Sequence, residues 1–195
     1  TLDRSSAASD VYKRQDTIVV PGANSDISSI GATMPYVRYD SEYAVLGGGA
    51  RLATSTDWAL TNVASQASNQ SYVVLPSGGS YAEWRLNSSG NGVVMRFTLP
   101  DTADGMGQRG SLDVYVNGSK VKTVDLTSYF MWQYLNGGAG DTPGNGTACF
   151  AFDEVHFRLD RSLVPGDTIR IQSSGASGLT YLSLIHISEP TRPLY

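Results

Sequence analysis

The chain has 195 residues, with 14 lysines and arginines against 18 aspartates and glutamates, and a net charge of −4. An acidic chain argues against a nucleic-acid binder, which needs a basic surface, and no apolar run is long enough to cross a membrane. A single cysteine excludes an intramolecular disulfide and a zinc cluster. The high content of Gly and Tyr, with only 16% charged residues, favours an all-β domain.

Both ends of the chain differ in character from its middle. Residues 5–15 read SSAASDVYKRQ and residues 182–192 read LSLIHISEPTR. DNA strings that encode these two peptides form an inverted repeat, which resembles the transposon end used in sequencing-library adaptors. We therefore interpret residues 1–15 and 182–195 as translated adaptor around a genomic fragment. The alternative is that two natural peptides happen to fit this DNA.

Between these ends, the sequence predicts a linker and one domain. Residues 16–34 are rich in Ser, Gly and Asn, which is typical of a linker. The domain is predicted over residues 35–181. Because both natural ends are missing in this interpretation, the lack of a signal peptide says nothing about secretion, and other domains can follow in the parent protein.

Short strands separated by turns follow along the domain. The Asn117-Gly118 pair predicts a type I′ hairpin turn, and residues 136–147 form a long Gly-rich loop. No stretch keeps a helical apolar pattern for three turns, so we expect a sandwich or barrel of about nine or ten strands. The predicted strands are residues 39–46, 50–54, 72–75, 81–86, 93–99, 112–116, 120–126, 129–134, 148–159 and 168–172, with a last strand from Leu179 that residues 182–187 could complete.

Two acidic residues lie in the first predicted strand. Strand alternation puts Asp40 and Glu42 on one face with Cα atoms about 6.5–7 Å apart, where their repulsion is roughly 2–3 kcal/mol at an effective dielectric constant near 20. If that face is enclosed, a calcium ion would relieve the repulsion. The alternative is a solvated polar face on an edge strand.

Three stretches resemble carbohydrate-binding modules of the family 6/35/36 type. They are YDSEYA at 39–44 with LGGGA at 46–50, SLDVYVNG at 111–118, and DEVH at 153–156 with PGDTIRI at 165–171. The resemblance implies a galactose-binding-like jelly-roll β-sandwich of antiparallel strands and no catalysis. It also implies a structural calcium, held by Asp40, Glu42 and an aspartate of the final strand. Leu184 stands where that aspartate is expected, so calcium is implied for the parent protein and an incomplete site for this chain.

Aromatic side chains are the candidate sugar contacts, because a flat ring can meet the C–H face of a pyranose while polar groups fix its hydroxyls. The densest group precedes the Gly-rich loop, where Tyr129, Trp132 and Tyr134 are candidates. If residues 129–134 are extended, Phe130 shares a face with Trp132 and Tyr134. The alternative for Trp132 is packing in the core or in the loop.

Residues 148–159 show a second candidate face, with a core-like face opposite to it. It carries the candidates Phe150, Phe152 and His156. The alternative is a central strand buried on both sides with a hydrogen-bonded histidine. Trp58, in a loop rich in Ser, Thr and Asn, is a further sugar-binding candidate, whereas Trp84 is expected in the core.

Support for catalysis is weak in the sequence. Asp153 and Glu154 are adjacent, so on a strand they point to opposite faces and cannot flank one glycosidic bond. We therefore expect a non-catalytic carbohydrate-binding module, itself not an enzyme, from a secreted, extracellular polysaccharide-degrading protein. Its expected partners are a polysaccharide or oligosaccharide and an adjacent catalytic domain, with no nucleic acid and no membrane. The alternatives are a structural sandwich that docks on a catalytic domain without binding sugar, and part of a hydrolase or lyase with its own active site.

Overall fold

The structure is a computed structural model that describes residues 36–59, 61–135, 147–150, 152–175 and 184–188. The chain divides into two units, Thr1–Met34 and Pro35–Tyr195, and all described residues belong to the second. The expected N-terminal adaptor and linker, and residues 136–146 of the Gly-rich loop, therefore lie outside the described residues. Within the described part, no helix is long and apolar enough to span a membrane.

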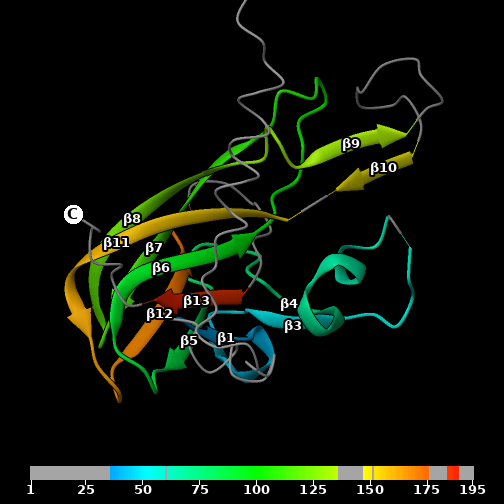
Figure 1. The fold of residues 1–195 in the computed structure, drawn as a ribbon. Helices are drawn as coiled ribbons and strands as arrows, with labels where there is room; N and C mark the ends of the chain where they lie inside the picture. Colours follow the sequence, from blue (N-terminus) through cyan, green and yellow to red (C-terminus); the bar gives the residue numbers. More distant parts are fainter. Residues whose placement is uncertain (1–35, 60, 136–146, 151, 176–183, 189–195) are drawn as a thin grey trace, which may run out of the picture. The chain divides into compact units, whose positions relative to one another are not determined.

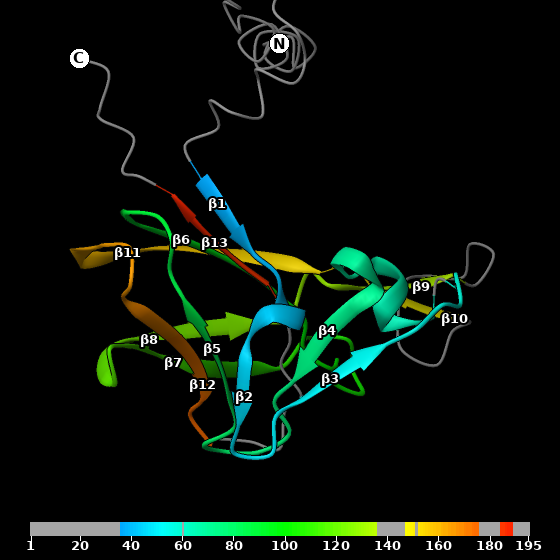
Figure 2. The ribbon, with the colours of Figure 1, turned by 90° about the horizontal axis from the view of Figure 1, so that it is seen from below.

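Two antiparallel sheets face each other within the second unit, as Figure 2 shows most clearly. The first sheet has the order β1 (Tyr36–Tyr39), β13 (Leu184–Ser188), β6 (Gly90–Phe97) and β11 (Asp153–Leu163). The second has the order β2 (Val45–Gly47), β5 (Tyr81–Arg85), β12 (Thr168–Ser173), β7 (Arg109–Val116) and β8 (Ser119–Thr127). The prediction of an all-β sandwich is confirmed.

Two strand pairs extend from the same end of this sandwich (Figure 1). One pair is β3 (Arg51–Thr54) with β4 (Ser71–Val74), and the other is β9 (Trp132–Leu135) with β10 (Thr147–Phe150). The loop between β3 and β4 contains the short 3-10 helices η2 (Val63–Gln66) and η3 (Ser68–Gln70). The β9–β10 pair carries the candidates Trp132, Tyr134 and Phe150, and the loop between β3 and β4 carries Trp58.

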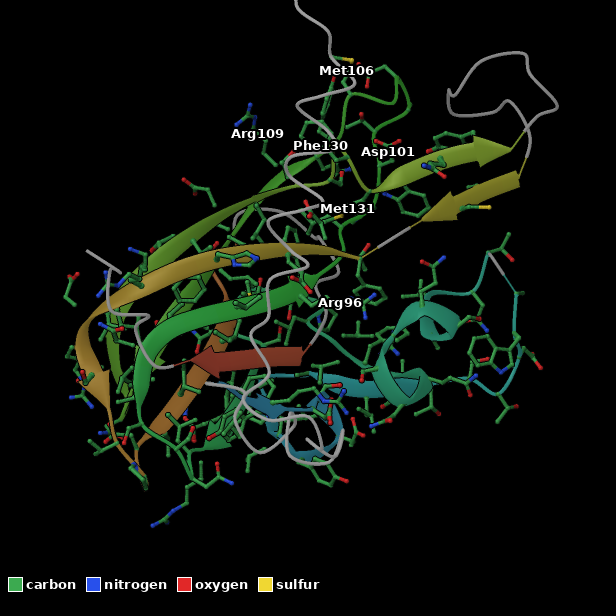
Figure 3. The ribbon with its side chains drawn as sticks, in the orientation of Figure 1. Arg96, Asp101, Met106, Arg109, Phe130 and Met131 are labelled. Carbon is green, nitrogen blue, oxygen red and sulfur yellow. The ribbon has the colours of Figure 1, made fainter. Side chains whose placement is uncertain are left out.

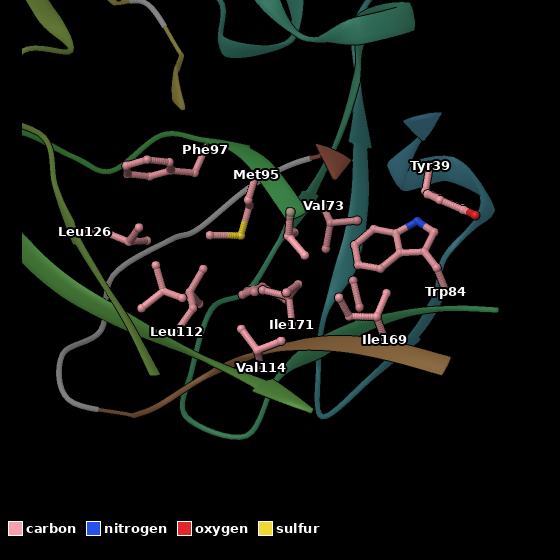
Figure 4. Packing of buried hydrophobic residues seen from close by; sticks show 14 of the residues in the cluster. Tyr39, Val73, Trp84, Met95, Phe97, Leu112, Val114, Leu126, Ile169 and Ile171 are labelled. Atoms are coloured by element: carbon pink, nitrogen blue, oxygen red, sulfur yellow. The ribbon is translucent and has the colours of Figure 1, made fainter. Parts of the chain in front are cut away.

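The core lies between the two sheets, where alternate residues of each strand point inward. In β12, Ile169 and Ile171 are buried in the core cluster; Ile171 lies toward Met95 of the opposite sheet, and Ile169 lies beside Trp84 (Figure 4). Trp84 of β5 is buried as expected, and its indole N–H donates to the Asp40 backbone oxygen over 2.9 Å. This bond ties the second sheet to the end of β1.

The C-terminal strand β13 completes the first sheet. It pairs with β1 on one side and with β6 on the other, so the prediction that residues 182–187 would pair as a closing strand is confirmed for Leu184–Ser188. The β1–β13 ladder ends at the pair Tyr39 and Ile185, so Asp40 directly follows this last pair and Leu184 directly precedes it in the chain. The adaptor origin of the segment stays a prediction.

Three predicted strands are divided differently in the structure. Residues 39–46 are interrupted by the 3-10 turn η1 (Ser41–Tyr43), because the chain leaves the first sheet after β1 and enters the second at β2. Residues 148–159 are divided in the same way between β10 and β11. The predicted strand 129–134 begins only at Trp132. The alternation of side chains along a strand gives no indication of the residue at which the chain passes from one sheet to the other.

The hairpin turn at Asn117-Gly118 is confirmed. Both residues have positive φ, 50° and 80°, as a type I′ turn requires. The Asn117 side chain also donates to the Asp167 carboxylate over 2.7 Å and accepts from the Thr168 N–H over 2.8 Å. The turn between β7 and β8 is therefore fixed to the start of β12.

Candidate functional site

The first candidate region surrounds the start of β9, where three chain segments are hydrogen-bonded together. The Ser128 N–H donates to the Gln108 carbonyl over 2.9 Å, and the Gln108 N–H donates to the Ser128 hydroxyl over 2.8 Å. The same hydroxyl donates to the Pro100 carbonyl over 2.8 Å. Asp101 accepts from the Gly107 N–H over 3.1 Å. These bonds hold the loop 101–108 against the turn before β9.

Gly107 allows this close packing. Its φ of +76° is in the left-handed region, and a Cβ atom at this position would lie 2.5 Å from the Tyr129 backbone nitrogen. Only glycine combines that conformation with that contact. The position of the loop relative to the turn is therefore encoded in the sequence.

Trp132 and Tyr134 use their polar atoms to hold β9 in place. The Trp132 Nε1–H donates to the Leu99 carbonyl over 2.9 Å, and the Tyr134 hydroxyl donates to the Asp101 carboxylate over 2.8 Å. Both side chains are half-buried, and Trp132 also packs against the core cluster. Phe150 of β10 pairs with Trp132, but its side chain lies outside the described residues. Sugar stacking by these rings stays a prediction.

The turn before β9 exposes an apolar patch, which we call the Phe130 patch and define as Met106, Tyr129 and Phe130. Phe130 is 79% exposed, and its ring meets that of Tyr129 edge to face with centroids 4.7 Å apart. Figure 3 shows Met106 and Phe130 at the same end of the molecule. The expectation that Phe130 shares a strand face with Trp132 is wrong, because Phe130 lies in the turn while the next residue, Met131, is buried.

Another candidate region is the outer face of β11. This strand lies at the edge of its sheet, and the His156 side chain is 68% exposed beside Glu154, with Nε2 and Oε2 3.6 Å apart. The alternative of a strand buried on both sides is therefore wrong. Phe152 is half-buried, and the Arg96 guanidinium lies 4.8 Å from its ring centroid. Burial lowers the pKa of Arg96, against the charge of Glu154, which raises it.

Asp40 and Glu42 lie at η1, where the chain crosses between the sheets. Arg38 pairs with Asp40 Oδ2 over 2.9 Å, and the Asn69 amide donates to Glu42 Oε1 over 2.7 Å. The second oxygens, Asp40 Oδ1 and Glu42 Oε2, are buried and have no hydrogen-bond partner in the described part of the chain. The Ser71 hydroxyl, on the strand beside η1, is also buried without a partner.

These oxygens fit a calcium ion. Buried polar atoms are normally hydrogen-bonded, so orphaned carboxylate oxygens need a partner, and Ca²⁺ takes carboxylate, carbonyl and hydroxyl oxygens. Among the described residues, no third acid, histidine or cysteine joins Asp40 and Glu42. Leu184 and Asp40 each adjoin the last pair of the β1–β13 ladder, Tyr39 with Ile185. Calcium binding by Asp40 and Glu42 stays a prediction.

Trp58 lies in the loop beyond the ends of β3 and β4. Its side chain is 81% exposed. With the Gln70 amide oriented to satisfy both of its neighbours, the Trp58 indole N–H donates to the Gln70 side-chain oxygen over 2.8 Å. Sequence reasoning identified Trp58 but missed Gln70, because the left-handed backbone of Gln70, with φ of 52°, leaves no signal in the sequence.

The comparisons with a family model and with solved structures agree on one family. The model described as "Alpha-1,3-glucanase catalytic domain D1" matches residues 33–189. The crystal structure of the Agl-KA catalytic domain is 52% identical, with a TM-score of 0.76, and the match covers 83% of this chain and 30% of that chain. The catalytic domain of a GH87 α-1,3-glucanase in complex with nigerose is 23% identical, with a TM-score of 0.70 over 83% of this chain and 29% of that chain. Among curated proteins, none matches.

A family 35 carbohydrate-binding module from Clostridium thermocellum shares the fold alone, with 19% identity and a TM-score of 0.50 over 79% of this chain and 98% of that chain. The expectation of a family 6/35/36 module is therefore wrong, because the motifs behind it follow the fold and the family match lies elsewhere. The expectations of a non-catalytic module and of a protein that is not an enzyme are wrong for the same reason. The chain belongs to the family of the α-1,3-glucanase catalytic domain D1.

Proposed function

We propose that this chain is the D1 part of the catalytic unit of an α-1,3-glucanase that acts outside the cell. The match over residues 33–189 carries the proposal, supported by 52% identity to the Agl-KA catalytic domain. The chain spans about 30% of that relative, so the activity proposed is that of the longer protein. Related GH87 catalytic domains are in complex with nigerose and with tetrasaccharides, and we propose α-1,3-linked glucose oligosaccharides as ligands of this unit.

Hydrolysis of a glycosidic bond needs two carboxyl groups, one of which stays protonated near neutral pH because its pKa is raised. Two described carboxyl groups have shifted pKa values, and both are lowered. The hydrogen bond from the Thr102 hydroxyl lowers the pKa of Asp104, and the hydrogen bond from the Asn117 amide lowers that of Asp167. A carboxyl group with a lowered pKa stays ionised near neutral pH, so it does not hold the proton that the acid of the reaction must donate. We therefore do not propose Asp104 or Asp167 as the proton donor of the reaction.

The test uses the natural protein that contains this D1 segment, extended to the length of its relatives. The purified protein is incubated with α-1,3-glucan, starch and dextran, and the release of reducing ends is measured. We expect release from α-1,3-glucan alone. Release from starch or dextran but not from α-1,3-glucan would contradict the proposed substrate, and no release from any of the three would contradict the proposed activity.

The Phe130 patch is the proposed contact with the longer part of the catalytic unit. The exposed rings of Tyr129 and Phe130 are in contact there, and Met106 is exposed at the same end of the molecule; exposed apolar area of this kind is what the centre of a protein interface contains. About 70% of the solved relative's length lies outside the match, which makes that part the natural occupant. In the longer protein, Phe130→Ser should lower the melting temperature, whereas in the isolated chain it should not. Equal effects in both would contradict the contact.

We also propose that calcium stabilises the D1 part of the parent protein through Asp40 and Glu42. The orphaned buried oxygens of these two residues support the site. Calcium would neutralise the two carboxylates and hold η1 in place where the chain crosses between the sheets. Because Leu184 stands where a third acidic ligand is expected, this chain should respond to calcium weakly.

A further inference from the structure

Trp58 is unusual in being a tryptophan almost fully in water. Its side chain is 81% exposed, whereas tryptophan normally buries most of its large surface. Trp84 is buried and Trp132 is half-buried in the same chain. An exposed tryptophan gives the folded state little hydrophobic stabilisation, so its position needs another explanation.

The loop around Trp58 is fixed by hydrogen bonds on both sides of the residue. Before it, the Ser55 hydroxyl accepts from the Asp57 N–H over 3.1 Å and from the Asn62 amide over 2.6 Å. The Ser65 hydroxyl donates to the Asp57 carbonyl over 2.7 Å and accepts from the Ala59 N–H over 3.1 Å. The backbone that carries the ring is therefore held before any ligand arrives.

The ring itself is held at its polar edge. The indole N–H donates to Gln70, whose amide in turn donates to the Ser55 carbonyl over 3.1 Å. Gln70 and its neighbour Asn69 both have left-handed backbone, with φ of 52° and 51°. Such a conformation is unfavourable for residues other than glycine and is often found at functional positions. Here it places the amide that orients the Trp58 ring.

We propose that Trp58 is a glucan-binding platform, with its exposed ring stacked on the C–H face of a glucosyl residue. The negative π surface attracts the axial hydrogens of the sugar, and the exposed carboxylate of Asp57 supplies an acceptor for its hydroxyls. The identity of the sugar, an α-1,3-linked glucose chain, rests on the proposed function. Trp58 lies in the loop between β3 and β4, whereas the Phe130 patch lies at the turn before β9.

A sugar fits this site better than a protein partner. The loop that carries the ring contains Ser55, Thr56, Asp57, Thr61 and Asn62. Their polar side chains can bind hydroxyls, whereas the centre of a protein interface is a contiguous apolar area. A pyranose needs only one flat ring with polar groups at its rim. The Phe130 patch, with two exposed aromatic rings in contact and an exposed methionine at the same end of the molecule, has the opposite character.

The test measures binding of this chain to insoluble α-1,3-glucan by co-sedimentation, and to nigerose by quenching of tryptophan fluorescence. Trp58→Ala should weaken binding about tenfold, the loss typical of an exposed aromatic anchor. Trp58→Phe keeps a ring and should retain most of the affinity. Tyr43→Ala removes another strongly exposed ring, 78% exposed, and serves as the matched control that should bind like the original chain.

Three outcomes would overturn the platform: no sedimentation of the original chain with glucan, unchanged sedimentation of Trp58→Ala, or equal losses in Trp58→Ala and Tyr43→Ala. Failure here is distinguishable from failure of the proposed function. If the longer protein hydrolyses α-1,3-glucan but this chain binds it independently of Trp58, only the platform is refuted. If this chain binds through Trp58 but the longer protein releases no reducing ends, only the hydrolase proposal is refuted.

Discussion

Replacement of Leu184 by aspartate should give this chain a calcium response that it otherwise lacks. Residue 184 and Asp40 each adjoin the last pair of the β1–β13 ladder, Tyr39 with Ile185. Asp40 Oδ1 and Glu42 Oε2 are already buried without partners. A third carboxylate at this level would raise the charge and the number of oxygen ligands that a calcium ion can reach, which are the factors that set its affinity.

The size of the effect follows from mass action. If the completed site has the affinity of extracellular calcium modules, with Kd of about 0.1–1 mM, then about 10 mM calcium stabilises the folded state by about 1.4–2.7 kcal/mol. For a chain of this length, about 2–4 °C per kcal/mol translates this into a rise in melting temperature of about 3–11 °C. The original chain, with a site weaker than about 10 mM, should gain less than about 0.5 kcal/mol.

Thermal unfolding followed by circular dichroism, in EDTA and in calcium, measures the calcium-dependent stabilisation of Leu184→Asp and of the original chain. Leu184→Asn is the matched control, because it has the same shape as the aspartate without the charge. Residue 184 also pairs with Arg96 of β6, so the new carboxylate could form an ion pair instead. A stabilisation of Leu184→Asp that is the same with and without calcium would show that ion pair and refute the metal site.

Three further changes test how the fold supports these regions. Tyr134→Phe removes a hydrogen bond to the Asp101 carboxylate and should cost about 1–2 kcal/mol in urea unfolding, since bonds to charged groups are the stronger ones; an unchanged midpoint would show that this bond does not hold β9. Gly48→Ala and Gly49→Ala both place a Cβ at positive φ, which costs about 1–2 kcal/mol. Only at Gly48 would that Cβ also collide with a backbone oxygen, so Gly48→Ala should be clearly the less stable of the two variants. Hydrogen bonds lower the pKa of Asp167, so its carboxylate stabilises the folded state fully above its ordinary pKa near 4, and this stabilisation is lost as pH falls through the lowered pKa. Asp167→Asn should therefore lose less melting temperature than the original chain when the pH falls below about 4. The same dependence of melting temperature on pH in both proteins would contradict this.

The fold could be predicted because the local signals agree with one another. Alternation in β12 places Ile169 and Ile171 in the core, and Asn117-Gly118 forms the turn that its composition specifies. The C-terminal strand β13 pairs with β1 and β6, because an unpaired position between these strands would leave backbone groups and apolar surface exposed. These signals are short-range, and short-range signals are what a single sequence contains.

The function was missed for a physical reason. The Asp40–Glu42 opening and the Asn-Gly hairpin that resemble carbohydrate-binding modules are features of the sandwich itself, and the family 35 module indeed shares the fold. One fold supports several functions, so such motifs report architecture. The crossing of the chain between sheets at η1, and the left-handed Gln70 that orients Trp58, likewise depend on long-range packing.

A sandwich that holds glucan is useful to a hydrolase even if its own affinity is weak. In the proposed arrangement, D1 and the longer part of the catalytic unit are one polypeptide, and α-1,3-glucan offers many identical glucosyl residues. Once one contact forms, the next is intramolecular, with an effective concentration in the millimolar range for closely linked sites. A platform of one aromatic ring, which binds a short oligosaccharide weakly, can therefore keep a polymer near the reacting bond. Loss of Trp58 should consequently raise the KM of the longer protein for insoluble glucan more than its KM for nigerose-sized substrates, and equal changes for both would show that the ring acts within the active site instead.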